Sequence, residues 1–353
     1  MNLLDIPVLG LALQLLGYLV TVCTQNGTII LALTAPLAFG ALCGVMCERS
    51  GVVNIGIEGT MLAAAFVGWF VASIASQAIP ADPSPFFGAT PGLVIGLLAA
   101  IVCGMLVSAI LAWLAVTLRA DQIIAGTIIN IVAAGITGYF DVLFSTNPIP
   151  TAGKFEAFVP PSFLTDLPVV GWLFSALLNQ GPITMSLIVV VIVMEVLLFR
   201  SRWGLRTRAV GEHPKAAETV GISVIRLRYQ NVILGGVFAG LAGAWFTIDF
   251  GNSFVGGMTG GRGFIALAAL IFGRWRPVGA FLASLLFATS IALGTAIRTT
   301  PPTGQLGTIL GAIPEQFFAA LPYIVTIVVL AGVVGRSVAP AADGQPYERE
   351  SVS

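Results

Sequence analysis

Long apolar runs, separated by short polar connectors, make up most of this chain. The charge-free runs cover residues 6–47, 59–81, 83–118, 122–140, 167–194, 229–248, 277–297 and 316–335. A helix needs about 20 mainly apolar residues to cross a bilayer, so most runs hold one span and the first is long enough for two. The strands of a membrane barrel would alternate in polarity over about ten residues, and this pattern does not occur. The sequence therefore predicts an all-α polytopic membrane protein.

The pattern predicts about ten transmembrane or re-entrant helical segments in a single transmembrane domain, residues 1–335. They cover residues 8–24, 28–46, 58–79, 92–118, 122–143, 182–199, 229–248, 263–273, 277–297 and 314–334. The eighth is too short to span as a regular helix, so we expect it to belong to a broken or re-entrant element. Such backbone is tolerated at membrane depth where other protein covers it.

Positive charge is concentrated in one connector, residues 200–228, which holds seven of the 16 Lys and Arg residues and the single His. If this connector is cytoplasmic, only Lys154, Arg262 and Arg298 fall outside, as the positive-inside rule requires. Both termini then lie in the cytoplasm. Residues 145–181 become a long external loop, either a packed lid or a docking surface for an external partner. The polar tail, residues 336–353, is expected to be disordered.

Composition narrows the possible functions. The chain is 57% apolar and 9% charged with a formal net charge of zero, so nothing suggests a nucleic-acid partner. Cys43 and Cys47 lie one helical turn apart, but no further His or Cys pair completes a metal site. A single His and dispersed acids argue against a membrane-embedded enzyme. A phosphate-binding loop is also missing from the sequence, so any ATP hydrolysis belongs to a separate chain.

The middle of the connector has the pattern of a short helix, Pro214–Gly221. Proline suits the first helical turn, and glycine is a natural helix stop. Ala216, Ala217 and Val220 can form a small apolar face on it. A two-turn helix does not persist alone in water, so it needs packing from the membrane domain or from a partner protein. Composition alone favours an ordinary basic connector over a docking element.

Polar residues at membrane depth are the candidates for a substrate pathway. Asn54 and Glu58 lie one turn apart on a predicted helix, where they either form an acceptor-rich face for a small polar substrate or tie helices together. Asn130 lies in the middle of a span and either lines a pore or joins two helices. Gly51 and Gly56 can interrupt a helix, and such breaks accompany binding or gating in transporters.

A glycine-rich segment, residues 249–263, leads into the short eighth segment. It is either a flexible outer gate held by hydrogen bonds from Arg262 or a tight turn between helices. A single arginine is a poor basis for predicting an anionic substrate.

Four stretches of the chain resemble a known family. The run RAVGEHPKAAETVGISVIRLRYQNVILGGVFAGLAGA resembles the cytoplasmic-loop signature of ABC importer permeases in the branched-chain amino acid and ribose permease superfamily. The stretches CERSGVVNIGIEGTMLAAAF, DQIIAGTIINIVAAGITGYF and GGRGFIALAALIFGRWRPVGA resemble its simple-sugar and nucleoside subgroup, which works with a Bmp-type lipoprotein. The resemblance covers about residues 28–335.

This resemblance implies a permease subunit of an ATP-driven importer for nucleosides or related ribosides in the cell membrane. The implied partners are a second homologous permease, a cytoplasmic ATP-binding protein that holds ATP and Mg, and an extracytoplasmic substrate-binding lipoprotein. No cofactor is implied on this chain. The residues implied to form the helix that couples to the ATPase are Gly211, Glu212, Pro214, Ala216, Ala217 and Gly221.

Other transporters remain as alternatives. Simple-sugar permeases share these motifs with nucleoside permeases, and branched-chain amino acid permeases belong to the same superfamily. An ion-coupled secondary transporter would need titratable groups inside the bundle, and Glu58 and Glu195 are its only candidates. The sequence leaves a heterodimer and a homodimer of permeases open, although the subgroup implies the former.

Overall fold

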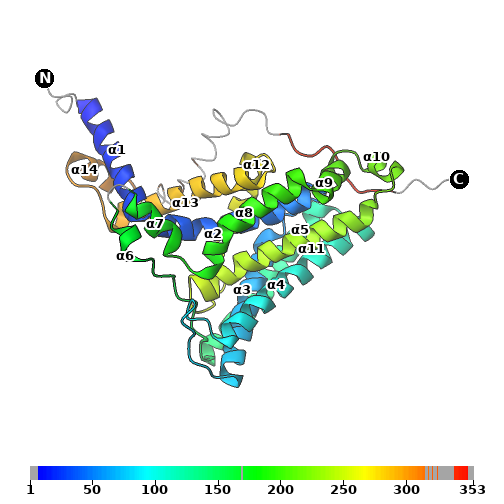
Figure 1. The fold of residues 1–353 in the computed structure, drawn as a ribbon, viewed down its shortest axis with the longest axis horizontal. Coiled ribbons are helices and arrows are strands. Elements are labelled where there is room, and N and C mark those ends of the chain that lie inside the picture. The colour runs from blue at the N-terminus through cyan, green and yellow to red at the C-terminus, as the bar shows by residue number, and fades with distance from the viewer. Residues whose placement is uncertain are drawn as a thin grey trace. The chain divides into compact units, whose positions relative to one another are not determined.

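The computed structural model describes residues 7–167, 170–314, 317, 320, 324 and 338–348, and every regular element in them is a helix (Figure 1). The longer helices are α1 (Pro7–Gln25), α2 (Gly27–Glu48), α3 (Ile57–Ala78), α4 (Pro91–Ala112), α5 (Gln122–Thr146), α8 (Pro182–Arg200), α11 (Val224–Ala244) and α13 (Pro277–Thr299). The shorter ones are α6 (Ser162–Thr165), α7 (Gly171–Leu178), α9 (Arg202–Glu212), α10 (Pro214–Thr219), α12 (Arg262–Phe272) and α14 (Gln305–Gly311). Two π-helical turns, η2 (Trp113–Thr117) and η3 (Trp245–Asp249), continue α4 and α11.

Seven helices in the described residues are long and apolar enough to cross a membrane: α2, α3, α4 with η2, α5, α8, α11 with η3, and α13. These account for seven of the ten predicted segments. The predicted segment 8–24 is α1, and the short segment 263–273 is α12 with 11 residues. Residues 314–334 lie almost entirely outside the described residues. The predicted all-α membrane fold is confirmed, whereas the count of ten is not.

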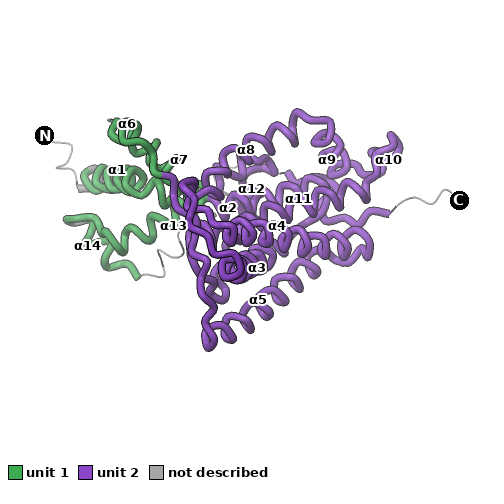
Figure 2. The backbone as a smooth tube through the Cα atoms, turned by 60° about the horizontal axis from the view of Figure 1, so that its bottom comes forward, with its two compact units in different colours: residues 1–34, 159–180, 285–335 green, residues 35–158, 181–284, 336–353 purple. Residues whose placement is uncertain are grey.

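The chain divides into two compact units (Figure 2). Unit 1 contains residues 1–34, 159–180 and 285–335. In it, α1 contacts both α7 and α14. The Tyr18 hydroxyl donates to the carbonyl oxygen of Thr300 at 3.0 Å, and the Gln180 side-chain amide donates to that of Thr28 at 2.9 Å. Part of the predicted external loop is therefore folded into the short helices α6 and α7, of which α7 packs against α1.

Unit 2 contains residues 35–158, 181–284 and 336–353 and carries the candidate site. Its centre is a close packing of α3, α4 and α11, made possible by small residues. A β-carbon added at Gly104 of α4 would lie 2.2 Å from the carbonyl oxygen of Gly236 on α11. Helices that approach this closely are stabilised by van der Waals contact along their backbones, which bulkier residues would prevent.

The break between α2 and α3, residues 49–56, is non-helical but largely buried in unit 2. Ser50 and Val52 are fully buried there. Irregular backbone without water must find partners inside the protein. The hydrogen-bonding partners of this break decide which predicted site residues come together.

The C-terminal segment differs from the expectation of a disordered tail. Residues 338–348 lie against the connector in unit 2, where the Ala342 amide donates to the carbonyl oxygen of Gly211 at 2.9 Å. Ala342 and Tyr347 are buried in this packing. The polar composition predicted disorder for this segment. Composition does not show that a few small and aromatic residues can pack in a groove formed by other elements. Residues 336–337 and 349–353 lie outside the described residues.

Candidate functional site

Asn130 of α5 fastens the break between α2 and α3. Its side-chain NH2 group donates to the carbonyl oxygen of Ile55 at 3.0 Å, and its oxygen accepts from the Gly59 amide at 2.7 Å. One amide side chain thus satisfies a carbonyl at the end of the break and an N–H in the first turn of α3. Close packing supports this arrangement, because Gly56 meets the backbone of Gly126 on α5. Asn130 therefore joins two elements, the second of the two roles that its position allows.

Gln122, the first residue of α5, holds the same break from another point. Its side-chain oxygen accepts from the Val53 amide at 2.7 Å, and the side chain is 4% exposed. The sequence analysis missed this residue, because a glutamine at a helix start reads as an ordinary polar boundary. Its place directly after the N-cap Asp121, in a span that also carries Asn130, was the available signal.

Glu58 caps the short helix α12 rather than facing an open path. Its carboxylate accepts hydrogen bonds from the Thr259 hydroxyl at 2.7 Å, the Gly261 amide at 2.8 Å and the Gly263 amide at 2.6 Å. The first amides of a helix have no partner within the helix, and the helix dipole favours a negative group beside them. A carboxylate from the first turn of α3 thus fixes where α12 begins.

Arg262, the first residue of α12, braces the turn that precedes this helix. Its guanidinium donates to the carbonyl oxygens of Met258 at 3.1 Å and Thr259 at 3.2 Å, and it lies 5.4 Å from the ring centroid of Phe246. The glycine-rich segment is therefore held by side chains on both sides, Glu58 at its amides and Arg262 at its carbonyls.

Asn54 and Glu58 do not share a helical face as the sequence analysis expected. The reason is that α3 begins only at Ile57, so Asn54 lies in the break. Asn54 is 1% exposed and donates weakly to the sulfur atoms of Cys43 and Cys47 on α2, at 3.5 and 3.6 Å. The structure thus brings Gly56, Glu58, Asn130 and Arg262 into one network and directs Asn54 toward α2.

The connector between α8 and α11 forms two helices, α9 and α10. The predicted helix at Pro214 is confirmed: α10 starts at this proline, and Gly221 follows its end with φ of 82°, a left-handed conformation that glycine adopts without strain. Ala217 is 4% exposed and packs in a cluster with Val210, Val224, Leu227 and Tyr347. Ala216 and Val220 stay exposed. The predicted apolar face is therefore split, with one residue inside and two left on the surface.

The model for the family described as branched-chain amino acid transport system, permease component, matches residues 27–333. This chain belongs to that family.

The permease is also similar to individual proteins over most of its length. It is 39% identical over 321 residues to a guanosine ABC transporter permease protein, NupQ, of Bacillus subtilis, covering 90% of this chain and 94% of the relative. It is 36% identical over 320 residues to a nucleoside ABC transporter permease protein, NupC, of Lactococcus lactis, covering 90% and 95%. A putative glucose ABC transporter permease protein, TsgC13, of Haloferax volcanii is 32% identical over 328 residues, covering 89% and 94%. No solved structure matches the chain. The permease is thus a multi-pass cell-membrane protein.

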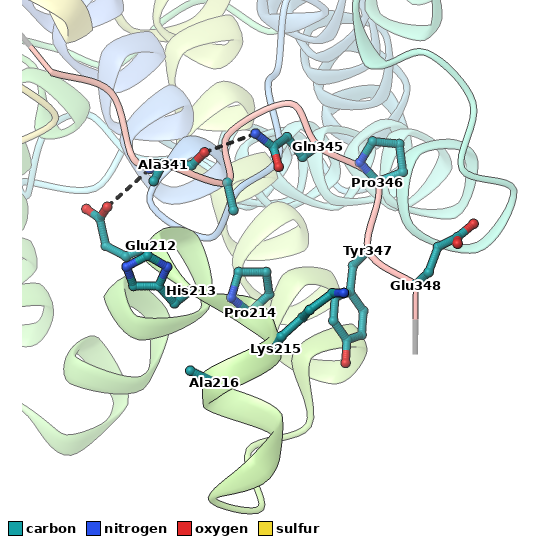
Figure 3. Close-up of a pocket in the computed structure, with 11 residues that line it drawn as sticks. Glu212, His213, Pro214, Lys215, Ala216, Ala341, Gln345, Pro346, Tyr347 and Glu348 are labelled. Carbon is teal, nitrogen blue, oxygen red and sulfur yellow. Dashed lines mark hydrogen bonds between the residues drawn. The ribbon is translucent and has the colours of Figure 1, made fainter. Parts of the chain in front are cut away.

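In this permease the C-terminal segment and α10 enclose an open groove of about 660 Å3 (Figure 3). The Glu212 carboxylate accepts from the Ala341 amide at 3.1 Å, the Tyr347 hydroxyl contacts the Glu218 carboxylate, and Arg119 pairs with Glu348 at 2.9 Å. The coupling candidates at residues 211–217 therefore belong to a surface that the C-terminal segment completes. Sequence reasoning missed this contribution because a contact between segments more than 100 residues apart leaves no local pattern.

Arg228 and Gly51 connect this surface to the break between α2 and α3. Arg228 is 1% exposed and donates to the carbonyl oxygen of Gln345 at 2.9 Å. Gly51 has φ of 85°, and a β-carbon there would lie 2.7 Å from an Arg228 nitrogen. Gly51 therefore packs against Arg228 and the C-terminal segment, and it does not belong to the network around Glu58.

The buried carboxyl of Asp343 predicts that docking of the C-terminal segment depends on pH. Burial raises the pKa of this carboxyl to about 7, and Glu48 and Arg228 face it. A group whose folded pKa is raised stabilises the packed state at low pH and loses that contribution as the pH rises through the folded pKa. We expect amide protection of residues 338–348, corrected for intrinsic exchange, to fall up to about tenfold between pH 6 and pH 8, since one pKa unit corresponds to a factor of ten.

Hydrogen exchange of the intact permease measures this effect. Asp343→Asn removes the titration of this carboxyl, so protection of residues 338–348 should change clearly less over the same pH range than in the intact permease. The Leu205 amide, which donates to the carbonyl oxygen of Ser201 at the start of α9, is the internal reference. Equal pH dependence in the Asn variant would contradict the assignment to Asp343.

Proposed function

We propose that this permease is the transmembrane subunit of an ABC importer that carries ribonucleosides into the cell. The observation that carries the proposal is its similarity to NupQ and NupC over about nine-tenths of each chain. Ala216 on α10 and Val220 directly after it are exposed and add a docking surface at the expected coupling position. The permease itself catalyses no covalent step, and ATP with Mg is bound by a partner subunit.

The orientation follows the charges. With α9 and α10 in the cytoplasm, the groove beside residues 341–348 faces the ATPase, and both termini lie on the cytoplasmic side. The proposed partners are a second homologous permease, a cytoplasmic ATP-binding protein and an external substrate-binding lipoprotein. ATP binding would move α10 as a rigid element, and the attached α9 and α11 would transmit this movement to the bundle.

The two acidic candidates of an ion-coupled transporter are engaged in structural contacts. Glu58 caps α12. Glu195 pairs with Arg276 and accepts from the Val278 amide at the start of α13. A proton or ion carrier needs a group that exchanges its ligand during transport, and both carboxylates already hold helix ends. This favours coupling to ATP over coupling to an ion.

A test of the coupling surface uses Val220, which directly follows α10 and is 74% exposed. We expect Val220→Asp to reduce co-purification with the partner ATPase at least about tenfold, because an apolar contact is replaced by a desolvated charge. Replacing residues 214–221 by a Gly/Ser linker should abolish co-purification. The matched control is Val159→Asp on the external segment, where the valine is 82% exposed.

Uptake of radiolabelled nucleosides completes the test. We expect uptake to require ATP and to be lost in the linker variant. If a proton ionophore abolished uptake while cellular ATP stayed high, ATP coupling would be wrong. If the intact transporter took up glucose and no nucleoside, the substrate class would be wrong, and similarity to TsgC13 would be the better guide.

A further inference from the structure

A second cavity lies in unit 2, apart from the network around Glu58. It has a volume of about 210 Å3. Residues of α3, of the last turns of α5 and of the segment after η3 line it, among them Trp69, Asp141, Phe144, Ser145, Ser253 and Phe254. None of the residues that line it is basic.

One wall of the cavity belongs to a cluster of aromatic rings. The Trp69 ring centroid lies 5.9 Å from that of Phe144 and 6.3 Å from that of Phe254. Behind them, Phe66 stacks on Phe140 at 5.3 Å and meets Phe254 edge to face at 5.3 Å. Rings that pack on one another in this way are fixed in orientation, so the wall is rigid before any ligand arrives.

The lining of the cavity also contains a charged group, the carboxylate of Asp141 on α5. Among the described residues, no hydrogen bond or ion pair engages its carboxylate. The side chain is half-buried. At Gly256, a β-carbon would lie 2.9 Å from a carboxylate oxygen, so glycine leaves the group room to turn toward a ligand. A carboxylate without a protein partner beside an aromatic wall is an acceptor for hydroxyl groups.

The cavity lies far from the coupling surface. The start of α5, at Gln122, lies just after Arg119 in the chain. Arg119 pairs with Glu348 of the C-terminal segment, so this end of α5 is next to the coupling surface. Asp141 is 19 residues further along the same helix, about 28 Å away at 1.5 Å per residue. With the connector in the cytoplasm, the cavity opens at the outer end of the bundle, where a substrate enters.

We infer that this cavity is an entry subsite for ribonucleosides, an inference that rests on the proposed function. The base packs against the exposed ring surface of this aromatic wall, to which Trp69, Phe144 and Phe254 present faces and edges at different tilts. Such a contact tolerates any base because every base has a π-face. The Asp141 carboxylate accepts hydrogen bonds from the ribose 2′- and 3′-hydroxyls, the role that an acidic side chain has toward ribose in dinucleotide-binding proteins.

The lining separates this ligand from the alternatives. A branched-chain amino acid could pair its ammonium group with Asp141, but its carboxylate would have no basic group in the lining and its aliphatic side chain would make no use of the flat rings. A free sugar offers hydroxyls to Asp141 but has no flat aromatic group to pack against the rings of the wall. Only a ligand with an apolar flat ring at one end and a diol at the other matches both parts.

The test compares ribonucleosides with their 2′-deoxy forms in the complete transporter. Each pair for adenosine, guanosine, cytidine and uridine competes for uptake of the best-transported labelled nucleoside. We expect the intact permease to favour ribonucleosides about tenfold or more, since a hydrogen bond to a charged group contributes about 1.5–3 kcal/mol. Asp141→Asn should reduce that preference to about twofold, chiefly because ribonucleosides compete less strongly for uptake. The matched control is Asp82→Asn, at an exposed position outside the cavity.

A second variant addresses the aromatic wall. Phe144→Leu should weaken competition by ribonucleosides and by deoxyribonucleosides equally, about tenfold, and leave the preference between them unchanged. It also tests the site if Asp141→Asn fails to accumulate. Free ribose at millimolar concentration should not compete.

The outcomes separate the two proposals. If the intact transporter takes up no nucleoside, the proposed function fails and this subsite fails with it. If nucleosides are taken up but Asp141→Asn keeps the full ribose preference, only the subsite is overturned. Competition by free ribose as strong as by nucleosides would likewise overturn the role of the aromatic wall.

Discussion

Replacing Gly104 by valine is expected to prevent the permease from accumulating in the membrane. A β-carbon at this position would lie 2.2 Å from the carbonyl oxygen of Gly236 and 2.9 Å from the α-carbon of Gly240. Both atoms are backbone, so neither can rotate away as a side chain could. The contact is made in both directions, because a β-carbon at Gly236 would lie 2.4 Å from the carbonyl oxygen of Gly104.

Valine would therefore force α4 and α11 apart along a packed core. Overpacking a rigid core costs about 1–3 kcal/mol, and contact with backbone falls at the upper end of that range. Separating these helices also loosens α3, which packs on both. We expect a loss of at least about 3 kcal/mol, enough to unfold a marginally stable protein.

Membrane abundance and size-exclusion profiles of a tagged permease measure the effect. The matched control is Gly135→Val on α5, the same substitution at a helical glycine with no other atom within 4 Å of its added β-carbon. Gly135→Val should accumulate as the unmodified permease does. If both variants accumulated equally, the close approach of α4 and α11 would be wrong.

The second large effect is expected for Glu58→Ala, which should reduce uptake at least about 100-fold while the permease still reaches the membrane. The substitution removes every acceptor that the side chain offers to the start of α12. The Gly261 and Gly263 amides would be left without partners inside the protein. Hydrogen bonds to a charged group contribute about 1.5–3 kcal/mol each, so the start of α12 would fray.

The variant Glu58→Gln is an intermediate between the intact permease and Glu58→Ala. Glu58→Gln keeps one oxygen that can accept from Thr259 and the Gly261 amide, but it presents an NH2 group to the Gly263 amide. We expect an intermediate loss of uptake, and hydrogen exchange at the start of α12 should rise in the order Glu, Gln, Ala. Asp82→Ala, at an exposed position, is the charge control. Unchanged protection of α12 in Glu58→Ala would contradict the capping role.

The local features of this protein follow from its sequence. Hydropathy places α2, α3, α4, α5, α8 and α13 to within a few residues, because a membrane span needs about 20 apolar residues whatever its neighbours are. The shortness of α12 and the start of α10 at Pro214 are equally local, since run length and a proline at the first turn require no distant contact. Motifs spread over most of the chain indicated the permease family, which the comparisons confirm.

Only the tertiary structure decided what the polar residues contact. Asn54 and Glu58 look like one helical face in sequence, but the break extends to Gly56, and they turn to α2 and α12. The C-terminal segment reads as disordered, yet it packs beside a connector more than 100 residues away. Trp69, Asp141 and Phe254 come from three distant stretches and meet around one cavity. Hydrophobicity and helical period act over neighbouring residues, whereas a carboxylate or amide takes whichever partner the packed helices bring within 3 Å, and no local pattern records that choice.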